Sequence, residues 1–95
     1  STAIYPNTTD TLNILDFGGK KDSSDNNKAA LETAMESMSG REGVIYFPEG
    51  KYLFKGSVRI KSGITIQGAG AKQTFFYFAA ANTVSEDAFI INNDV

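Results

Sequence analysis

The side chains in this chain most able to do acid–base chemistry are two pairs of neighbouring carboxylates. Asp22 and Asp25 lie in a polar stretch after Gly18-Gly19, and Glu86 and Asp87 lie in a stretch of small residues near the C-terminus. Two carboxylates about 5–10 Å apart across a groove can cleave a glycosidic bond. Neighbouring acids in one polar loop are usually just solvated. We therefore predict that neither pair is catalytic, and we assign no catalytic residue to this chain.

A second acidic motif has part of the spacing of a calcium loop. Asp22, Ser24 and Asn26 are placed like the first three ligands of an EF-hand. Asn27 stands where that loop needs an invariant glycine, and Thr33 stands where it needs a glutamate. We interpret the stretch as a loop followed by a helix cap, and we predict no metal site.

Gly68-Ala69-Gly70 is similar to half of a dinucleotide-binding fingerprint. That fingerprint needs a third glycine and a helix whose first N–H groups hold the phosphates. Here Gln73 takes the place of the third glycine, and a run of aromatic residues follows it. We interpret the motif as a tight turn and predict no cofactor.

Composition removes several other classes of function. The 95 residues include no cysteine and no histidine, so disulfides, thiolate metal sites and histidine bases are excluded. The net charge is −2 with no basic stripe, which argues against binding to nucleic acid. No apolar run reaches the length of a membrane span, so we expect no membrane partner.

The run Phe75-Phe76-Tyr77-Phe78 is the strongest candidate for a contact surface. In a strand, its side chains alternate, so two aromatic rings lie on each face. One face should point into the core. The other is either covered by the loop at residues 79–87 or available to a sugar or a neighbouring subunit.

These residues must be positioned by one helix and a series of short strands. Leu31, Ala34, Met35 and Met38 share one face of a helix predicted over residues 26–39, with Asp25 or Asn26 as its N-cap and Gly40 after its end. A short strand over residues 12–16 and a polar loop over residues 20–27 should precede the helix. After it, strands are predicted at residues 43–47, 51–54, 58–60, 64–67, 74–78 and 88–91, separated by turns such as 48–50. Short strands without intervening helices favour a solenoid whose open end the helix covers.

Three sequence blocks in this order resemble the N-terminal segment of pectate-lyase-like right-handed parallel β-helix proteins. They are DFGGKKDSSDNNKAALETA at residues 16–34, IYFPEGKY at residues 45–52 and VRIKSGITIQGAG at residues 58–70. The family has Gly-Asp-Gly where this chain has Lys21-Asp22-Ser23, so we expect a turn of different shape there.

The resemblance implies an all-β fold with one capping α-helix: the start of a right-handed, single-stranded parallel β-helix. Residues 1–11 are then an N-terminal arm, and residues 12–95 are the helix cap and first coils of a domain that continues beyond Val95. Catalytic carboxylates in such proteins lie on later coils, so we expect them beyond Val95.

By resemblance, we favour a bacteriophage tail appendage or tailspike that binds and degrades a polysaccharide or teichoic-acid-like glycan of the cell surface. A homotrimer on the virion tail or outside the cell would be expected. Two alternatives stay open: a fragment of a monomeric polysaccharide lyase, glycoside hydrolase or epimerase, and a purely structural cap and assembly module. Further coils with clustered Asp and Glu on one strand face would favour an enzyme.

Overall fold

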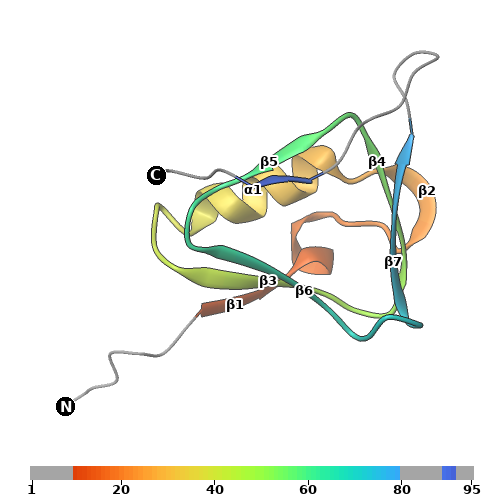
Figure 1. Cartoon of the computed structure of the whole chain (residues 1–95), viewed down its shortest axis with the longest axis horizontal. Coiled ribbons are helices and arrows are strands. Elements are labelled where there is room, and N and C mark those ends of the chain that lie inside the picture. The colour runs from red at the N-terminus through yellow and green to blue at the C-terminus, as the bar shows by residue number, and fades with distance from the viewer. Residues whose placement is uncertain (1–9, 80–88, 92–95) are drawn as a thin grey trace.

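The strands of this chain form three short parallel sheets that enclose one core (Figure 1). The computed structural model describes residues 10–79 and 89–91. The strand orders are β1-β3-β6, β2-β4-β7 and β5-β8, and every pair is parallel. The elements are β1 (Asp10–Asn13), the 3₁₀ helix η1 (Ile14–Phe17), β2 (Asp22–Asn26), α1 (Lys28–Ser37), β3 (Gly43–Phe47), β4 (Gly50–Lys55), β5 (Val58–Ile60), β6 (Ile64–Gly68), β7 (Thr74–Ala79) and β8 (Phe89–Ile91).

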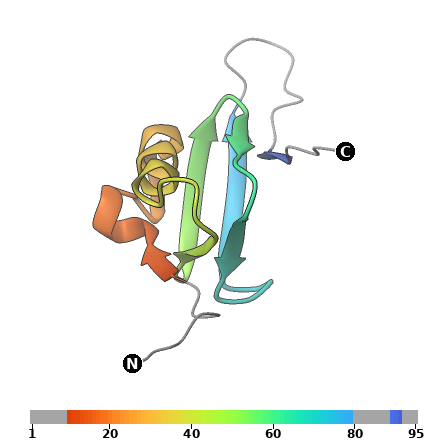
Figure 2. The ribbon, with the colours of Figure 1, turned by 90° about the vertical axis from the view of Figure 1, so that its left-hand side faces the viewer.

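Successive circuits of the chain stack on one another with like residues in register. The circuit β3-β4-β5 is followed by the circuit β6-β7-β8, so that Ile45 pairs with Ile66 and Tyr52 pairs with Phe76. Figure 2 shows the two circuits edge-on as adjacent layers. Because each strand hydrogen-bonds to the equivalent strand of the next circuit, the chain is a coil and not a set of hairpins.

The first circuit differs from the others because a helix takes the place of its third strand. The chain runs through β1 and β2 and then forms α1, which lies beside β5 of the next circuit (Figure 1). Together with η1, α1 forms the end layer of the stack (Figure 2). A terminal helix with one apolar face is the capping role predicted from the sequence.

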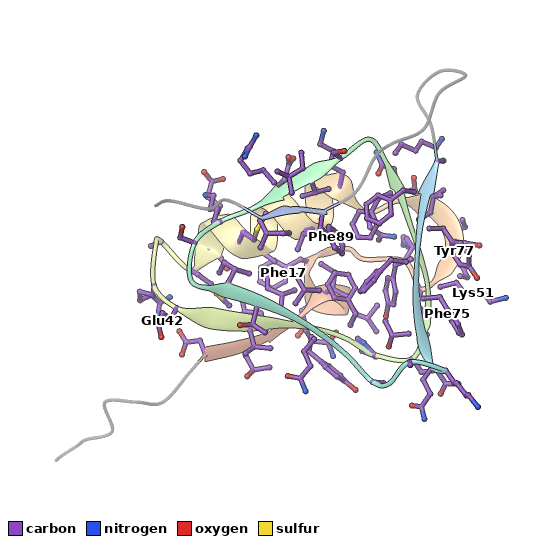
Figure 3. All side chains as sticks on the ribbon, in the orientation of Figure 1. Phe17, Glu42, Lys51, Phe75, Tyr77 and Phe89 are labelled. Atoms are coloured by element: carbon purple, nitrogen blue, oxygen red, sulfur yellow. The ribbon has the colours of Figure 1, made fainter. Side chains whose placement is uncertain are left out.

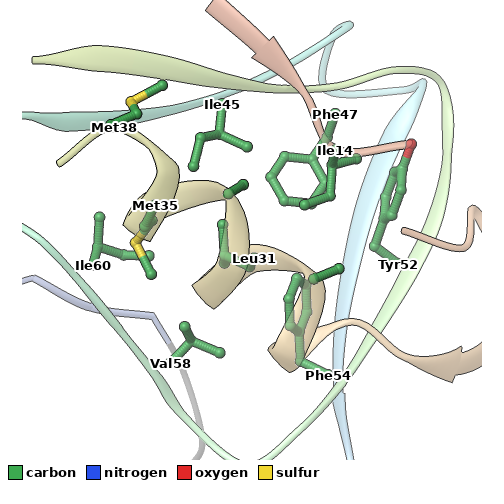
Figure 4. Close-up of a cluster of buried hydrophobic side chains, with 12 residues drawn as sticks. Ile14, Leu31, Met35, Met38, Ile45, Phe47, Tyr52, Phe54, Val58 and Ile60 are labelled. Carbon is green, nitrogen blue, oxygen red and sulfur yellow. The ribbon is translucent and has the colours of Figure 1, made fainter. Parts of the chain in front are cut away.

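The apolar face of α1 is buried as predicted. Leu31 and Ala34 are fully buried, Met35 is 2% exposed and Met38 is 1% exposed. These side chains meet apolar residues of η1 and of the strands (Figure 4). The strand and η1 members of this core are Ile14, Ile45, Phe47, Tyr52, Phe54, Val58 and Ile60.

The ends of α1 differ from the sequence prediction. The helix spans Lys28–Ser37 and not residues 26–39, and Asn27 is its N-cap, so the assignment of Asp25 or Asn26 was wrong. Asn27 is 1% exposed and makes no side-chain cap bond, because its amide is used elsewhere. Asn26 instead accepts a hydrogen bond from the N–H of Lys28 at 3.1 Å through its side-chain oxygen.

Two local structures before the helix were also not predicted. The predicted polar loop at residues 20–27 contains the exposed strand β2, which pairs with β4 through an interrupted register. The predicted strand at residues 12–16 ends at Asn13, whose side chain accepts a hydrogen bond from the N–H of Leu15 at 2.9 Å and caps η1. A short side-chain acceptor at this position favours a helical turn over a continued strand.

The remaining strands lie close to their predicted positions. The strand predicted at residues 64–67 extends to Gly68, and the strand predicted at 74–78 extends to Ala79. Of the strand predicted at 88–91, the structure describes Phe89–Ile91, which form β8. The predicted turn at residues 48–50 is shorter than expected, because Gly50 already belongs to β4. Gly50 has φ +155°, and a Cβ atom on it would lie 2.7 Å from the carbonyl oxygen of Lys21. The close approach of β2 to β4 therefore requires glycine there.

Candidate functional site

The two carboxylates of β2 each accept a hydrogen bond from a backbone N–H close by in the sequence. Asp22 accepts a hydrogen bond from the N–H of Ser24 at 3.0 Å, and Asp25 accepts one from the N–H of Asn26 at 2.8 Å. Both carboxylates are exposed. Hydrogen bonds from Ser24, through its side chain first and its backbone second, hold the pKa of Asp22 below its ordinary value of 3.8. A carboxyl group with a lowered pKa is ionised at neutral pH, so it is poorly suited to donate a proton.

No other charged motif from the sequence forms a site within the described residues. Glu86 and Asp87 lie outside the described residues. Within residues 10–79 and 89–91, no group of three His, Cys, Asp or Glu side chains could hold a metal ion. The calcium-like spacing of Asp22, Ser24 and Asn26 falls on β2, where Ser23 adopts a left-handed φ of 57°.

The glycine motif at residues 68–70 forms a turn between two strands. β6 ends at Gly68 and β7 begins at Thr74, so no helix follows the motif. The hydroxyl of Thr74 accepts a hydrogen bond from the N–H of Ala69 at 2.8 Å and donates one to the carbonyl of Phe47 at 2.9 Å. A Cβ atom at Gly68 would lie 2.8 Å from that of Thr74. The motif thus ties this turn to the equivalent turn of the preceding circuit.

The aromatic run of β7 places two rings inside and two outside, as its alternation predicts. Phe76 packs on Phe47 with ring centroids 5.0 Å apart, and Phe78 stacks on Phe54 at 5.3 Å. Phe75 and Tyr77 point away from the core and are 38% and 45% exposed (Figure 3). The outward rings are therefore partly exposed, whereas residues 80–88 of the loop that was expected as a possible cover lie outside the described residues.

The outward rings belong to a mixed apolar and cationic surface. Lys51 and Lys55 are exposed on the adjacent strand β4, and half-buried Leu53 lies between them. The register pairs Lys51 with Phe75 and Leu53 with Tyr77. Lys51, Phe75 and Tyr77 project from the same side of the molecule (Figure 3). We call these five residues the outer aromatic face.

The sequence indicated only half of this surface. The aromatic run predicted that two of its four rings face outward, but their neighbours on β4 depend on the register between two strands. The alternation of Lys51, Leu53 and Lys55 was the only available signal that this strand has a cationic outer side.

A hollow of about 310 Å³ lies on another part of the molecule, between α1 and β5. It is lined by Glu32, Met35, Glu36, Arg59 and Lys61. Two acids from the helix face two bases from the strand and its end, so the lining has no net charge. A balanced lining gives no preference for a cationic or an anionic ligand.

Stacked parallel strands in three sheets, closed at one end by a helix, define the class of the protein as a parallel β-helix. The chain belongs to the rhamnogalacturonase A/epimerase, pectate lyase-like family, whose profile matches residues 11–95. This match and the solved structures below confirm the predicted right-handed, pectin-lyase-like fold and its capping helix. The family also supports a carbohydrate-active class of protein.

Two solved structures are similar to this chain. The A-module of mannuronan C-5 epimerase AlgE4 from Azotobacter vinelandii is 26% identical over 74% of the chain, with a TM-score of 0.65. The A-module of mannuronan C-5 epimerase AlgE6 from the same organism is 22% identical over 72% of the chain, with a TM-score of 0.66. The chain spans 21% and 20% of these two structures, or about a fifth of each. No curated protein sequence matches the chain at a significant level.

Among the helices of the described residues, none is both long and apolar enough to cross a membrane.

Proposed function

We propose that this chain is the N-terminal cap and first coils of a β-helix enzyme that acts on a polysaccharide. The observation that supports the proposal most is the circuit pattern. A helix closes the first circuit, and two stranded circuits follow in register, as in a family that includes rhamnogalacturonases and epimerases. In this proposal the cap positions the coils, and the reacting carboxylates lie on coils outside residues 1–95.

The reaction that we favour is inversion at C-5 of a uronic acid residue within a polymer. The support is the likeness to two mannuronan C-5 epimerase modules, one of them 26% identical to this chain. Cleavage of the same kind of polymer by a lyase or a hydrolase is the nearest alternative, because the family profile is pectate lyase-like. The purely structural cap is the alternative without chemistry.

A bacteriophage tailspike is our second candidate for the parent protein. It is supported by the polar composition of residues 1–11, which suits a linker from an attachment domain. In that case the protein would be a homotrimer on the virion tail that holds a cell-surface glycan. In the epimerase case it would act outside the cell without an attachment role.

The test is to incubate the whole protein with a panel of polyuronates and neutral polysaccharides. Nuclear magnetic resonance of the products reports inversion at C-5, new reducing ends without unsaturation report hydrolysis, and unsaturated uronate ends report elimination. We expect one of these changes on a uronate polymer. A whole, folded protein that binds no polysaccharide and changes none would overturn the proposal. Assembly as a trimer that adsorbs to bacterial cells would favour the tailspike.

A further inference from the structure

We propose that the outer aromatic face is a binding site for a chain of an anionic, carboxylated polysaccharide. The inference rests on the proposed function, because it takes a glycan as the partner. It adds a surface that would hold the uronate polymer that the proposed function already names. It gives this cap segment a part in holding the polymer, apart from any catalytic groove.

The apolar half of the site is a pair of nearly parallel rings. The ring centroids of Phe75 and Tyr77 are 6.5 Å apart, and their planes differ by 22°. Leu53 is the register partner of Tyr77 and extends the apolar strip onto β4. The face of an aromatic ring carries partial negative charge, so it attracts the C–H groups of a sugar ring laid flat on it. Two adjacent rings in one orientation provide a platform for consecutive sugar units.

The cationic half of the site is placed to meet carboxylates at the edge of this platform. Lys51 and Lys55 lie on the same side of one strand, about 13 Å apart along it. Lys51 pairs with Phe75, so the two side chains leave the sheet from neighbouring positions on the same side. Lysine stems can pack along the apolar strip while their charged ends stay in water.

Neighbouring charges leave this surface cationic although the whole chain carries −2. The N–H of Lys51 donates to the carbonyl of Lys21 at 2.8 Å, so Lys21 adjoins the same corner. The acids beside this face are Asp22, the register partner of Lys51, Asp25 on the same strand and Glu49 in the turn before β4. The hydrogen bonds from Ser24 and the nearby charge of Lys20 both lower the pKa of Asp22, so Lys20 also adjoins this corner and four lysines stand against three acids. This small cationic excess, with Lys51 and Lys55 beside the rings, favours a polyanion over a cationic polymer.

A second copy of this chain fits the surface less well. A stable protein interface buries about 800 Å² on each partner, far more than three apolar side chains supply. A symmetric pairing would also bring the lysines of one copy toward those of the other, which is unfavourable without a counterion. An extended anionic chain has neither problem.

The experiment measures binding of the whole protein to polygalacturonate and to its methyl ester, which has the same backbone without the charge. The variants are Phe75→Ser, Tyr77→Ser and the double variant Lys51→Gln/Lys55→Gln. The matched controls are Ile90→Ser, another exposed apolar residue (39% exposed), and Arg59→Gln, an exposed cation on β5. Thermal melting checks that each variant is folded, and light scattering reports the oligomeric state.

We expect each aromatic variant to weaken binding of polygalacturonate about three- to tenfold. We expect the lysine variant to weaken it to a similar degree and to reduce its salt dependence, while both controls bind like the parent protein. The ester should bind more weakly than the polyanion.

Three results would overturn the inference. The first is that the variants bind polygalacturonate as tightly as the parent protein, and the second is that the ester binds as tightly as the polyanion. The third is that the variants change the oligomeric mass seen by light scattering but not glycan binding, which would indicate a protein partner. Enzymatic activity on short oligosaccharides is measured in parallel. If activity is present but the variants bind normally, the inference fails while the proposed function stands. If binding depends on the outer aromatic face and activity is absent, the inference stands and the enzymatic proposal fails.

Discussion

Replacement of Asn27 by alanine should destabilise the cap more than any other exchange of a polar residue described above. The Asn27 side chain is buried and joins three segments of the chain. Its oxygen accepts a hydrogen bond from the N–H of Lys20 at 2.7 Å. Its nitrogen donates to the carbonyls of Lys20 and Leu53, each at 3.1 Å. It therefore fastens the chain before β2 to β4 of the next circuit.

The size of the effect follows from the groups that lose their partner. The carbonyl of Leu53 keeps the backbone N–H of Asn27 at 2.8 Å. The groups that lose their Asn27 partner are therefore the N–H and the carbonyl of Lys20 and, through a longer bond of 3.4 Å, the carbonyl of Asp25. An unsatisfied buried polar group costs about 1–3 kcal/mol. Because Lys20 borders solvent, we take the low end of that range and expect a total loss of about 2–3 kcal/mol.

The assay is urea unfolding followed by circular dichroism, in which the Asn27→Ala midpoint should fall by roughly 1–2 M. Asn13→Ala is the control, since the Asn13 side chain accepts a hydrogen bond from the N–H of Leu15 and its loss should cost about 1 kcal/mol. If Asn27→Ala is no more destabilising than Asn13→Ala, the hydrogen bonds of Asn27 to Lys20 and Leu53 do not hold the first circuit in place.

Asn27→Asp gives an independent check of the same bonds through pH. A carboxylate at this position would face two carbonyl oxygens, so its folded pKa should rise above the ordinary value of about 3.9. A raised folded pKa favours the protonated form in the folded state. The free energy of unfolding of Asn27→Asp should therefore be closest to that of the parent chain below about pH 4. The difference between the two should grow as the pH rises through the folded pKa. A deficit that does not change with pH would contradict the assignment of the donor.

Four further predictions concern other parts of the chain. Leu31→Ala should lower the free energy of unfolding by about 2–5 kcal/mol in chemical denaturation, because Leu31 is fully buried under the cap; a loss below 1 kcal/mol would contradict that packing. Ser23→Gly should raise it by about 0.5–1 kcal/mol, since Ser23 holds a φ of 57° that glycine adopts without strain, and a loss would show that the left-handed turn is absent. Tyr52→Phe should cost about 1 kcal/mol near neutral pH, because the Tyr52 hydroxyl donates to the carbonyl of Pro48 at 2.8 Å. Burial raises the Tyr52 pKa above its ordinary value of 10.0, so the parent chain loses stability above pH 10. When the unfolding midpoint is measured against pH, the difference in stability between the parent and Tyr52→Phe should therefore become smaller above about pH 10. Asp22→Ala should leave any glycan-modifying activity of the whole protein within about tenfold, and a loss of several orders of magnitude in a folded variant would make Asp22 catalytic.

The strands after the helix were predictable because each alternates apolar and polar residues between turn signals. β4 buries Tyr52 and Phe54 and exposes Lys51 and Lys55, which is the pattern that the sequence spells out. β2 was not predictable, because all five of its residues are polar and exposed. Its strand conformation is imposed by pairing with β4, a tertiary effect that residue type does not encode.

The role of Asn27 and the outer aromatic face were hidden for similar reasons. An asparagine before a helix has the signature of an N-cap, and nothing local distinguishes it from one that bridges residues seven and twenty-six positions away. In β7 both faces are aromatic, so the sequence predicts two rings outward without saying which two. The register with β4 decides this, because it places Phe76 and Phe78 over the aromatic core.

The two ends of the stack are chemically unlike, and this gives the coil a direction of growth. On the capped side, β2 presents carboxylates and an irregular register, features that discourage the addition of another strand. On the opposite side, β7 follows β4 residue by residue from Gly50 to Lys55 without a break. Strand addition is therefore disfavoured at the capped end, whereas β7 is the edge strand of its sheet at the other end among the described residues. We expect the circuits to fold in order from the capped end, each one pairing with the circuit before it.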